Sequence, residues 1–320
     1  MESELLAIQP DLLPPHQNEY GRADQAADWA LLARLYLNAE VYTGKPRYTD
    51  AITYASKVIN AGYSLMPNYA NLFKSDNNVN NPEVILSINY DGNNTQNYGG
   101  TTFLVNSAIN GDMNPSSFGV PGGGWGGNRS TKNLPLAFGD YSGNTDHRAM
   151  FYGSNLDIKD PGTFTQGLAV VKFTNVTSTG ATPPNASVFV STDFPLFRLA
   201  EMYLTYAEAV VRGGKGGDIN TAVHYINLLR ERAYGNTNGD ITASQLTLDF
   251  LLQERMRELY WEGFRRTDLI RFGKFTSASY VWPWKGGVAD GTGVAGYRDL
   301  YPIPASDIIA NPNLKQNSGY

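Results

Sequence analysis

The chain has 320 residues, of which 42 % are hydrophobic and 17 % are charged, a balance that supports a hydrophobic core and excludes a disordered polymer. Twenty-five basic and thirty acidic residues give a net charge of −5, so no excess of positive charge is present to neutralise nucleic-acid phosphates. The absence of cysteine excludes thiol nucleophiles, disulfides and cysteine-bound metals. No apolar run approaches the length of about 18 residues that a membrane-spanning helix needs.

The first part of the chain predicts two helices after a proline-rich lead-in, residues 1–21. From Arg22 an alanine-rich stripe with helical spacing predicts a helix that ends before Gly44. A second helix is predicted from Asp50 to Gly62. The small alanine side chains allow these two helices to pack with their backbones close together.

Residues 63–195 lose this helical periodicity. Residues 83–90 alternate between apolar and polar side chains and predict a strand, and residues 168–174 predict another. Between them lie two segments rich in asparagine and glycine, 93–100 and 118–129. Loops of this length are uncommon in a compact domain unless they are functional or mobile.

Helical periodicity returns over residues 197–212, and a partner helix is predicted from the N-cap candidate Asp218 to Gly235. A longer helix is predicted over residues 248–262, with a short continuation over 268–272. Glycine and proline recur through the remaining tail, which is therefore predicted to be irregular.

The helix pairs at 22–62 and 197–235 have lengths close to the tetratricopeptide repeat of about 34 residues. The sequence therefore predicts a mainly α fold in which tetratricopeptide-like helix pairs form a scaffold. A large loop-rich insertion with a few short β-strands interrupts that scaffold. The scaffold is expected to comprise residues 22–62 and 197–273, and the loop-rich ligand-binding part residues 63–196 and 274–320.

Motifs for catalysis are lacking. The three histidines, His16, His147 and His224, are far apart in the sequence, and none belongs to a zinc-binding His-Glu-x-x-His pattern. No nucleophile elbow is present, and Gly122–Gly124 lacks the following lysine of a phosphate loop. We therefore expect no enzyme activity.

Three glutamates, Glu254, Glu258 and Glu262, recur every four residues on one predicted helix face. Two facing carboxyl groups are what a glycoside hydrolase needs, and Asp146 is a further candidate for that role. Five arginines crowd the same segment, however, and favour a structural network of ion pairs. The hydrolase remains the enzymatic alternative.

The glycine-rich loops carry the best candidate site. Sugar C–H faces stack on aromatic rings, and sugar hydroxyls bond to planar amides and guanidiniums. We expect Tyr98 and Trp125 to be stacking rings, Phe118 to lie with them, and Asn128 and Arg129 to act as polar clamps. The structural alternative is that these rings anchor the loops to the core.

A second aromatic cluster, formed by Tyr280, Trp282 and Trp284, is expected to serve packing. Asp76–Asn81 and Asp290–Gly293 contain oxygen ligands that calcium accepts, but neither has the spacing of a calcium loop. We therefore expect no metal and no cofactor.

Five segments in order resemble the SusD/RagB family of surface nutrient-binding lipoproteins of Gram-negative bacteria. The most specific runs from Glu254 to Gly273 and reads Glu-Arg-x-x-Glu-Leu-x-x-Glu-Gly-x-Arg-x-x-Asp-Leu-x-Arg-x-Gly. The other four are Tyr20–Leu37, Tyr54–Phe73, Phe197–Ala209 and Tyr301–Asn317. The stretch Trp282–Gly287 is similar to the starch-utilisation branch of the family.

The resemblance implies a non-catalytic protein on the outer face of the outer membrane that holds an oligosaccharide. It also implies a partner, a TonB-dependent (SusC-like) transporter against which the helical half packs while the loop-rich half presents the glycan. RagB-like relatives bind peptides, so a peptide ligand is one alternative. A purely protein-binding, tetratricopeptide-type scaffold is another.

Family members begin with a lipoprotein signal, a lipidated cysteine and further helices. Residues 1–320 resemble a single C-terminal region of such a protein, so we expect an N-terminally truncated fragment without the lipid anchor. Part of the aromatic arc that the family uses for ligand would then come from outside this chain.

Overall fold

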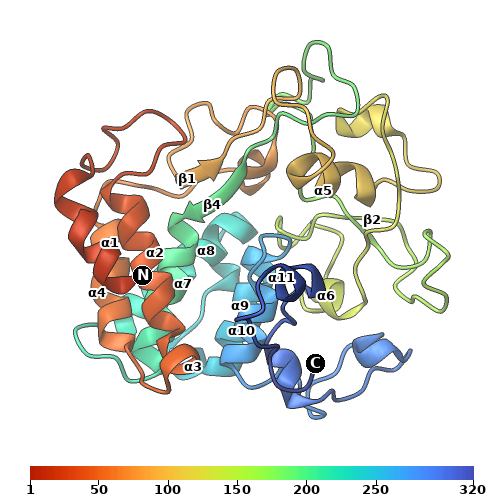
Figure 1. The fold of residues 1–320 in the computed structure, drawn as a ribbon. Helices are drawn as coiled ribbons and strands as arrows, with labels where there is room; N and C mark the ends of the chain where they lie inside the picture. Colours follow the sequence, from red (N-terminus) through yellow and green to blue (C-terminus); the bar gives the residue numbers. More distant parts are fainter. The chain divides into compact units, whose positions relative to one another are not determined.

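The computed structural model describes residues 1–320 and is mainly helical, with a few short strands (Figure 1). This confirms the predicted fold class. The chain divides into two compact units, Met1–Glu262 and Gly263–Tyr320. None of the helices combines the length and the hydrophobicity required to cross a bilayer.

The first unit contains nine α-helices and four strands. The helices are α1 (Glu2–Ile8), α2 (Gln25–Leu37), α3 (Ala39–Thr43), α4 (Tyr48–Ile59), α5 (Gly100–Ala108), α6 (Asn133–Leu136), α7 (Leu199–Val211), α8 (Ile219–Tyr234) and α9 (Leu248–Leu259). The strands are β1 (Val84–Ile88), β2 (Phe151–Tyr152), β3 (Ala169–Val170) and β4 (Phe194–Arg198). The second unit contains α10 (Arg265–Arg271) and α11 (Ala305–Ala310).

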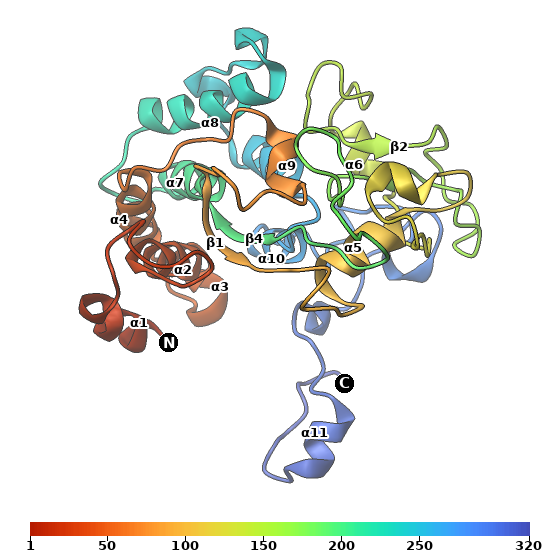
Figure 2. The same ribbon diagram turned by 90° about the horizontal axis from the view of Figure 1, so that it is seen from above.

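The helical scaffold of the first unit is a layer in which α2 packs on α4, α4 on α7, and α7 on both α8 and α9 (Figure 2). Fully buried alanines line these contacts, among them Ala30, Ala51 and Ala207. Their small side chains allow the close approach that the sequence predicts. The interior of the scaffold therefore combines these short side chains with larger buried ones such as Leu32 and Met202.

Local capping chemistry defines several helix ends. Asp24 begins α2 by accepting a hydrogen bond from the amide of Ala27, and Asp218 begins α8 by accepting from Asn220 and Thr221. Gly235 ends α8 in the left-handed conformation, with φ at 68°. The prediction that Asp218 and Gly235 bound this helix is confirmed.

Other helix boundaries differ from the prediction. Helix α4 begins at Tyr48, two residues before Asp50, and Asp50 lies in its first turn as the partner of Arg47. The lead-in contains α1, and α5 lies between the two predicted loop segments 93–100 and 118–129, where no helix was predicted. The sequence of α5 has β-branched residues and an asparagine, which are weak helix formers, so its stability comes from tertiary contacts that override propensity.

The structure has two small antiparallel sheets, one where the loop-rich part meets the scaffold and one within the loop-rich part. Strand β1, expected from alternation, pairs with β4, which precedes α7 and was not predicted. Strand β3 lies within the predicted segment 168–174 and pairs with β2. The register of the first sheet places Arg198 opposite Val84, next to the buried Glu83.

Helix α5 packs its inner face on the core of the loop-rich part, a cluster that includes Tyr69, Phe73 and Phe173. Val105 belongs to this cluster, whereas the ring of Phe103 on the same helix is exposed. The helix therefore presents one face to the core and one to solvent.

In the second unit, a buried lysine organises the aromatic segment. The Lys285 ammonium donates to the carbonyls of Ser277 and Tyr280 at 2.5 and 2.6 Å and lies 4.7 Å from the ring centroid of Trp282. The rings of Tyr280 and Trp282 contact each other at 6.3 Å. These rings thus serve packing within the unit, as the sequence predicts for this pair.

Candidate functional site

Tyr98 and Trp125 lie side by side on the surface of the loop-rich part. Their ring centroids are 6.0 Å apart, and the two residues are 67 % and 39 % exposed. Tyr98 comes just before α5, and Trp125 comes from the glycine-rich loop that follows it. The structure therefore brings together the two predicted stacking rings and leaves both open to solvent.

Two further rings extend this pair into a row. Phe189 lies 5.2 Å from Tyr98 and Phe103 lies 6.5 Å from Trp125, between ring centroids. We call Phe189, Tyr98, Trp125 and Phe103 the aromatic row. Sequence reasoning missed Phe103 because its segment was not expected to form a helix that turns Phe103 outward. It missed Phe189 because nothing local relates residue 189 to residue 98.

The glycine-rich loop around Trp125 is hydrogen-bonded to the last turn of α5. The amides of Trp125, Gly126 and Asn128 each donate at 2.9 Å to carbonyls at the end of this helix, those of Asn106, Ile109 and Ser107. The Ser107 and Ile109 carbonyls lie where a helix C-terminus leaves carbonyls without intrahelical partners, and the Asn106 carbonyl also accepts from the Ile109 amide at 3.3 Å. The loop around Trp125 is therefore fixed by the helix that also carries Phe103.

Glycine is required on both sides of Trp125. Gly124, Gly126 and Gly127 have φ angles of 93°, 68° and 109°, a region that residues with a Cβ rarely adopt. A Cβ at Gly124 would also lie 2.9 Å from the ring of Pro115. These glycines shape the loop and leave the indole without flanking side chains.

The two predicted polar clamps are both engaged with the protein. The amide of Asn128 donates to the hydroxyl of Ser107 at 2.8 Å. The guanidinium of Arg129 donates to three backbone carbonyls, those of Gly127, Pro161 and Gln166, at 2.6 to 2.7 Å. Both residues therefore stabilise the loops, and their direct contact with a ligand remains a prediction.

The contacts of Phe118 differ from those of Tyr98 and Trp125. Its ring meets Tyr152 edge to face, with centroids 6.3 Å apart, and packs against the core cluster. It is half-buried. Among the three rings predicted from the loops, Phe118 has the contacts of a loop anchor.

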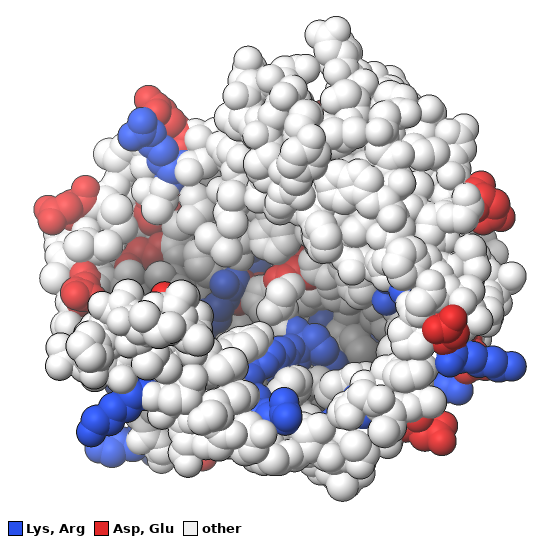
Figure 3. Space-filling model, turned by 45° about the vertical axis from the view of Figure 1, so that its right-hand side comes forward, with Lys and Arg blue, Asp and Glu red and all other residues white.

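The surface around the aromatic row carries little charge. Residues 92–139 include three charged side chains, Asp112, Arg129 and Lys132. The upper region of the face drawn in Figure 3 is almost free of charged groups. An uncharged polar ligand matches this surface better than an anion or a cation.

The three spaced glutamates lie in a buried ion-pair network, which confirms the structural interpretation of their spacing. Glu254 and Glu258 are fully buried, and Arg148 donates to them at 2.7 and 3.0 Å. Burial alone would raise the pKa of the Glu254 carboxyl, but Arg148, Arg257 and Arg230 overcome it and hold that pKa well below its usual range.

Asp146, the third carboxylate considered for hydrolysis, belongs to the same network. It is fully buried and accepts two hydrogen bonds from the Arg148 guanidinium, at 2.7 and 2.9 Å. A glycosidic bond cannot reach carboxyl groups that have no exposed surface. The carboxylates proposed for a hydrolase are thus engaged in holding the fold together.

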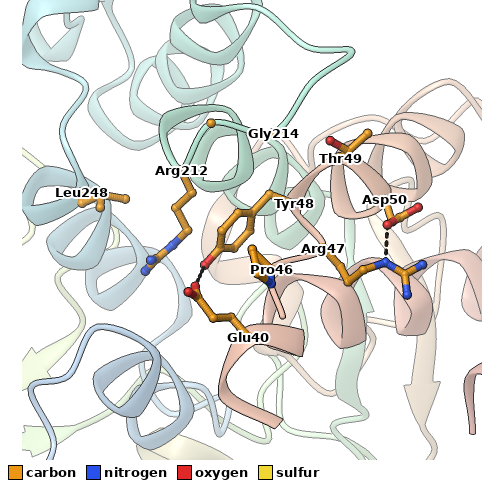
Figure 4. A pocket seen from close by; sticks show the side chains of 10 residues that line it. Glu40, Pro46, Arg47, Tyr48, Thr49, Asp50, Arg212, Gly214 and Leu248 are labelled. Atoms are coloured by element: carbon orange, nitrogen blue, oxygen red, sulfur yellow. Dashed lines mark hydrogen bonds and ion pairs between the residues drawn. The ribbon is translucent and has the colours of Figure 1, made fainter. Parts of the chain in front are cut away.

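The helical scaffold contains a hollow of about 660 Å³. Figure 4 shows Tyr48 directing its hydroxyl towards Glu40, to which it donates a hydrogen bond, with Arg212 beside them. Arg47 is paired with Asp50 at 2.5 Å. The one aromatic ring of this hollow is buried and its hydroxyl is engaged, so the hollow offers no open ring face. Its lining residues are Glu40, Pro46, Arg47, Tyr48, Thr49, Asp50, Arg212, Gly213, Gly214 and Leu248.

No group of three or more histidine, aspartate or glutamate side chains is arranged to bind a metal. In the first calcium candidate, the Asp76 carboxylate accepts hydrogen bonds from the amide and hydroxyl of Ser178 at 2.7 and 2.6 Å. Asp76 therefore serves to join two loops.

A model of the SusD family matches residues 144–320. The starch-binding protein SusD of Bacteroides thetaiotaomicron is 40 % identical over 365 aligned positions, which cover 100 % of this chain and 64 % of that protein. The SusD-like protein P38 of Formosa agariphila is 30 % identical over 199 positions, which cover 60 % of this chain and 34 % of that protein. The chain thus spans less than two thirds of the length of either relative.

Solved structures show the same fold. The surface glycan-binding protein A from Bacteroides thetaiotaomicron, in complex with laminarihexaose, superposes with a TM-score of 0.74 and 26 % identity. That similarity covers 98 % of this chain and 69 % of the solved one. Together with the family match over more than half of its length, this shows that the chain belongs to the SusD family.

Proposed function

We propose that this protein binds oligosaccharides without cleaving them and that the aromatic row is the surface on which sugar rings stack. The observation that carries the proposal is the exposure of Tyr98 and Trp125, side by side on a surface that bears little charge. Each ring face contributes on the order of 1 kcal/mol, so affinity from stacking is modest. The complex of a structurally similar protein with laminarihexaose supports the ligand class.

The absence of cleavage is part of the same proposal. Glu254, Glu258 and Asp146, the carboxylates with suitable spacing or position, are fully buried among arginines. A bound sugar would lie on the rings, where no pair of carboxyl groups flanks it. We therefore expect the glycan to leave the protein unchanged.

We further propose that the protein acts at the cell surface, in the outer membrane, as part of a glycan uptake complex. The similarity to surface glycan-binding proteins supports the location. In this proposal a lipid anchor attaches the protein to the membrane. A TonB-dependent, SusC-like transporter receives the oligosaccharide from it.

Native gel electrophoresis in gels that contain soluble starch, laminarin or no polysaccharide tests ligand binding. We expect the wild-type chain to be retarded in at least one polysaccharide gel and Trp125→Ala to be retarded less than the wild type in that gel. Reducing-sugar assays of the same mixtures should show no release. Equal mobility in all gels, together with binding to a peptide array, would favour the RagB-like alternative instead.

A further inference from the structure

We propose that Asn106 is the positioning residue of the aromatic row, an inference that rests on the proposed glycan binding. Asn106 lies in α5 and is fully buried, so it cannot touch a ligand. Its side chain and its carbonyl nevertheless hold both segments that carry or support the stacking rings. We infer that this residue sets the geometry between Trp125 and Tyr98.

The first set of contacts fixes the Trp125 loop. The side-chain oxygen of Asn106 accepts a hydrogen bond from the amide of Gly124 at 3.1 Å. Its backbone carbonyl accepts from the amide of Trp125 at 2.9 Å. Two consecutive amides of the loop are thus bound by one residue, directly at the base of the indole.

The second set fixes the segment behind Tyr98. The side-chain nitrogen of Asn106 donates to the carbonyl of Val188 at 2.8 Å, and the next residue, Phe189, is the ring that packs on Tyr98. One turn earlier on the same helix face, the hydroxyl of Thr102 accepts from the amide of Val190 at 3.1 Å. The residue on each side of Phe189 is therefore bound to α5.

The amide group of Asn106 makes three side-chain hydrogen bonds, because its nitrogen also donates to the carbonyl of Thr102 at 2.8 Å. Both of its N–H donors and its oxygen are thus used within the protein interior. Leucine has a similar size but could replace none of these bonds, and the amides and carbonyls would lose their partner. The expected consequence is a loop that samples several positions for Trp125.

Gly123, in the loop that Asn106 binds, allows the role of Asn106 to be tested without substituting Asn106 itself. A Cβ at Gly123 would lie 1.8 Å from the side-chain oxygen of Asn106, so Gly123→Ala must displace either the loop or the amide. The φ of Gly123 is not in the left-handed region, so alanine itself is tolerated by the backbone. Gly122→Ala is a matched control, because its Cβ would meet its nearest neighbour, a methyl of Val188, at an ordinary 3.5 Å.

Isothermal titration with laminarihexaose and with maltoheptaose measures the effect. We expect Gly123→Ala and Asn106→Leu to weaken sugar binding by about threefold to tenfold, for whichever sugar the wild type binds. This is the affinity that one ring contact contributes. Gly122→Ala should bind as the wild type does. Gly123→Ala added to Trp125→Ala should cause a smaller loss than it causes in the wild type, because much of the effect acts through the indole.

The outcomes separate the two proposals. If the wild type binds neither sugar, the proposed function fails first. The positioning role of Asn106 is overturned if the wild type binds a sugar, Trp125→Ala binds that sugar more weakly, and Gly123→Ala binds it as well as Gly122→Ala does. A loss on Gly123→Ala that persists in full in the Trp125→Ala background would also contradict it, because the effect would not pass through that ring.

Discussion

The guanidinium of Arg198 donates to both carboxylate oxygens of Glu262, at 2.7 and 2.8 Å, in the buried interior of the first unit. Arg198 ends the strand that leaves the loop-rich part, and Glu262 follows α9 of the scaffold. The same carboxylate accepts from the Lys172 ammonium at 2.7 Å. One glutamate of the scaffold therefore binds Lys172 of the loop-rich part and Arg198 at the end of β4.

Removing that carboxylate charge should destabilise the fold. Glu262→Gln leaves Arg198 and Lys172 buried beside a neutral group, for which we expect a loss of about 3–5 kcal/mol in the free energy of unfolding. Urea unfolding at pH 7 measures it. The control is Lys132→Met, which breaks an exposed pair with Asp157 and should cost less than about 1 kcal/mol. Equal effects in the two variants would contradict this role of the network.

Acid should weaken the same network. The pKa values of the Glu254 and Glu258 carboxyls are lowered, because nearby arginines outweigh the effect of burial. Such groups contribute stability that is present above their unfolded pKa of about 4.3 and is lost as the pH falls towards the folded value. The free energy of unfolding should therefore decrease between about pH 5 and pH 2, less steeply in Glu258→Gln. Identical pH profiles in both proteins would refute this.

Lys172 should titrate at an unusually low pH. Burial lowers the pKa of its ammonium to about 8, although Glu262 opposes the shift. Because the folded form then binds fewer protons than the unfolded form, this lysine favours folding increasingly as the pH rises from about 8 to about 10.4. NMR of ¹³C-labelled lysine side chains should show one resonance with a midpoint near 8 that is missing in Lys172→Met. Midpoints near 10.4 for every lysine would contradict the prediction.

Phe103, one of the two rings that sequence reasoning missed, should contribute to binding. Phe103 is 46 % exposed and lies next to Trp125 in the aromatic row. Phe103→Ala should weaken oligosaccharide binding by about twofold to tenfold without unfolding the protein. Tyr42→Ala is the control, since Tyr42 is exposed on α3 of the scaffold. If the Tyr42 variant loses as much affinity as the Phe103 variant, the row is not the binding surface.

Features with local causes could be predicted from the sequence. The caps Asp218 and Gly235 are examples, because the bonds that begin a helix lie within three residues of the cap. The glutamate spacing correctly indicated an ion-pair network. Its partners Arg148 and Arg198 could not be predicted, because they lie 110 and 60 residues away from Glu258.

The candidate site likewise combines features that have local causes with features that depend on residues far apart in the sequence. The length and the glycine content of the loops were enough to predict that Tyr98 and Trp125 are exposed. The support of that surface depends on contacts between distant segments, such as the bond from Asn106 to Val188 across 82 residues. Arg129 illustrates the remaining limit, because composition reveals a guanidinium in a loop but not that it donates to three backbone carbonyls.

The most direct test of the central claim is calorimetric titration of laminarihexaose and maltoheptaose into the wild type, the double variant Tyr98→Ala/Trp125→Ala and Tyr42→Ala. Loss of two ring contacts should weaken binding at least about tenfold in the double variant. Its Tm should stay within a few degrees of the wild type, and Tyr42→Ala should bind normally. Unchanged affinity in a folded double variant would show that sugars do not bind on these rings.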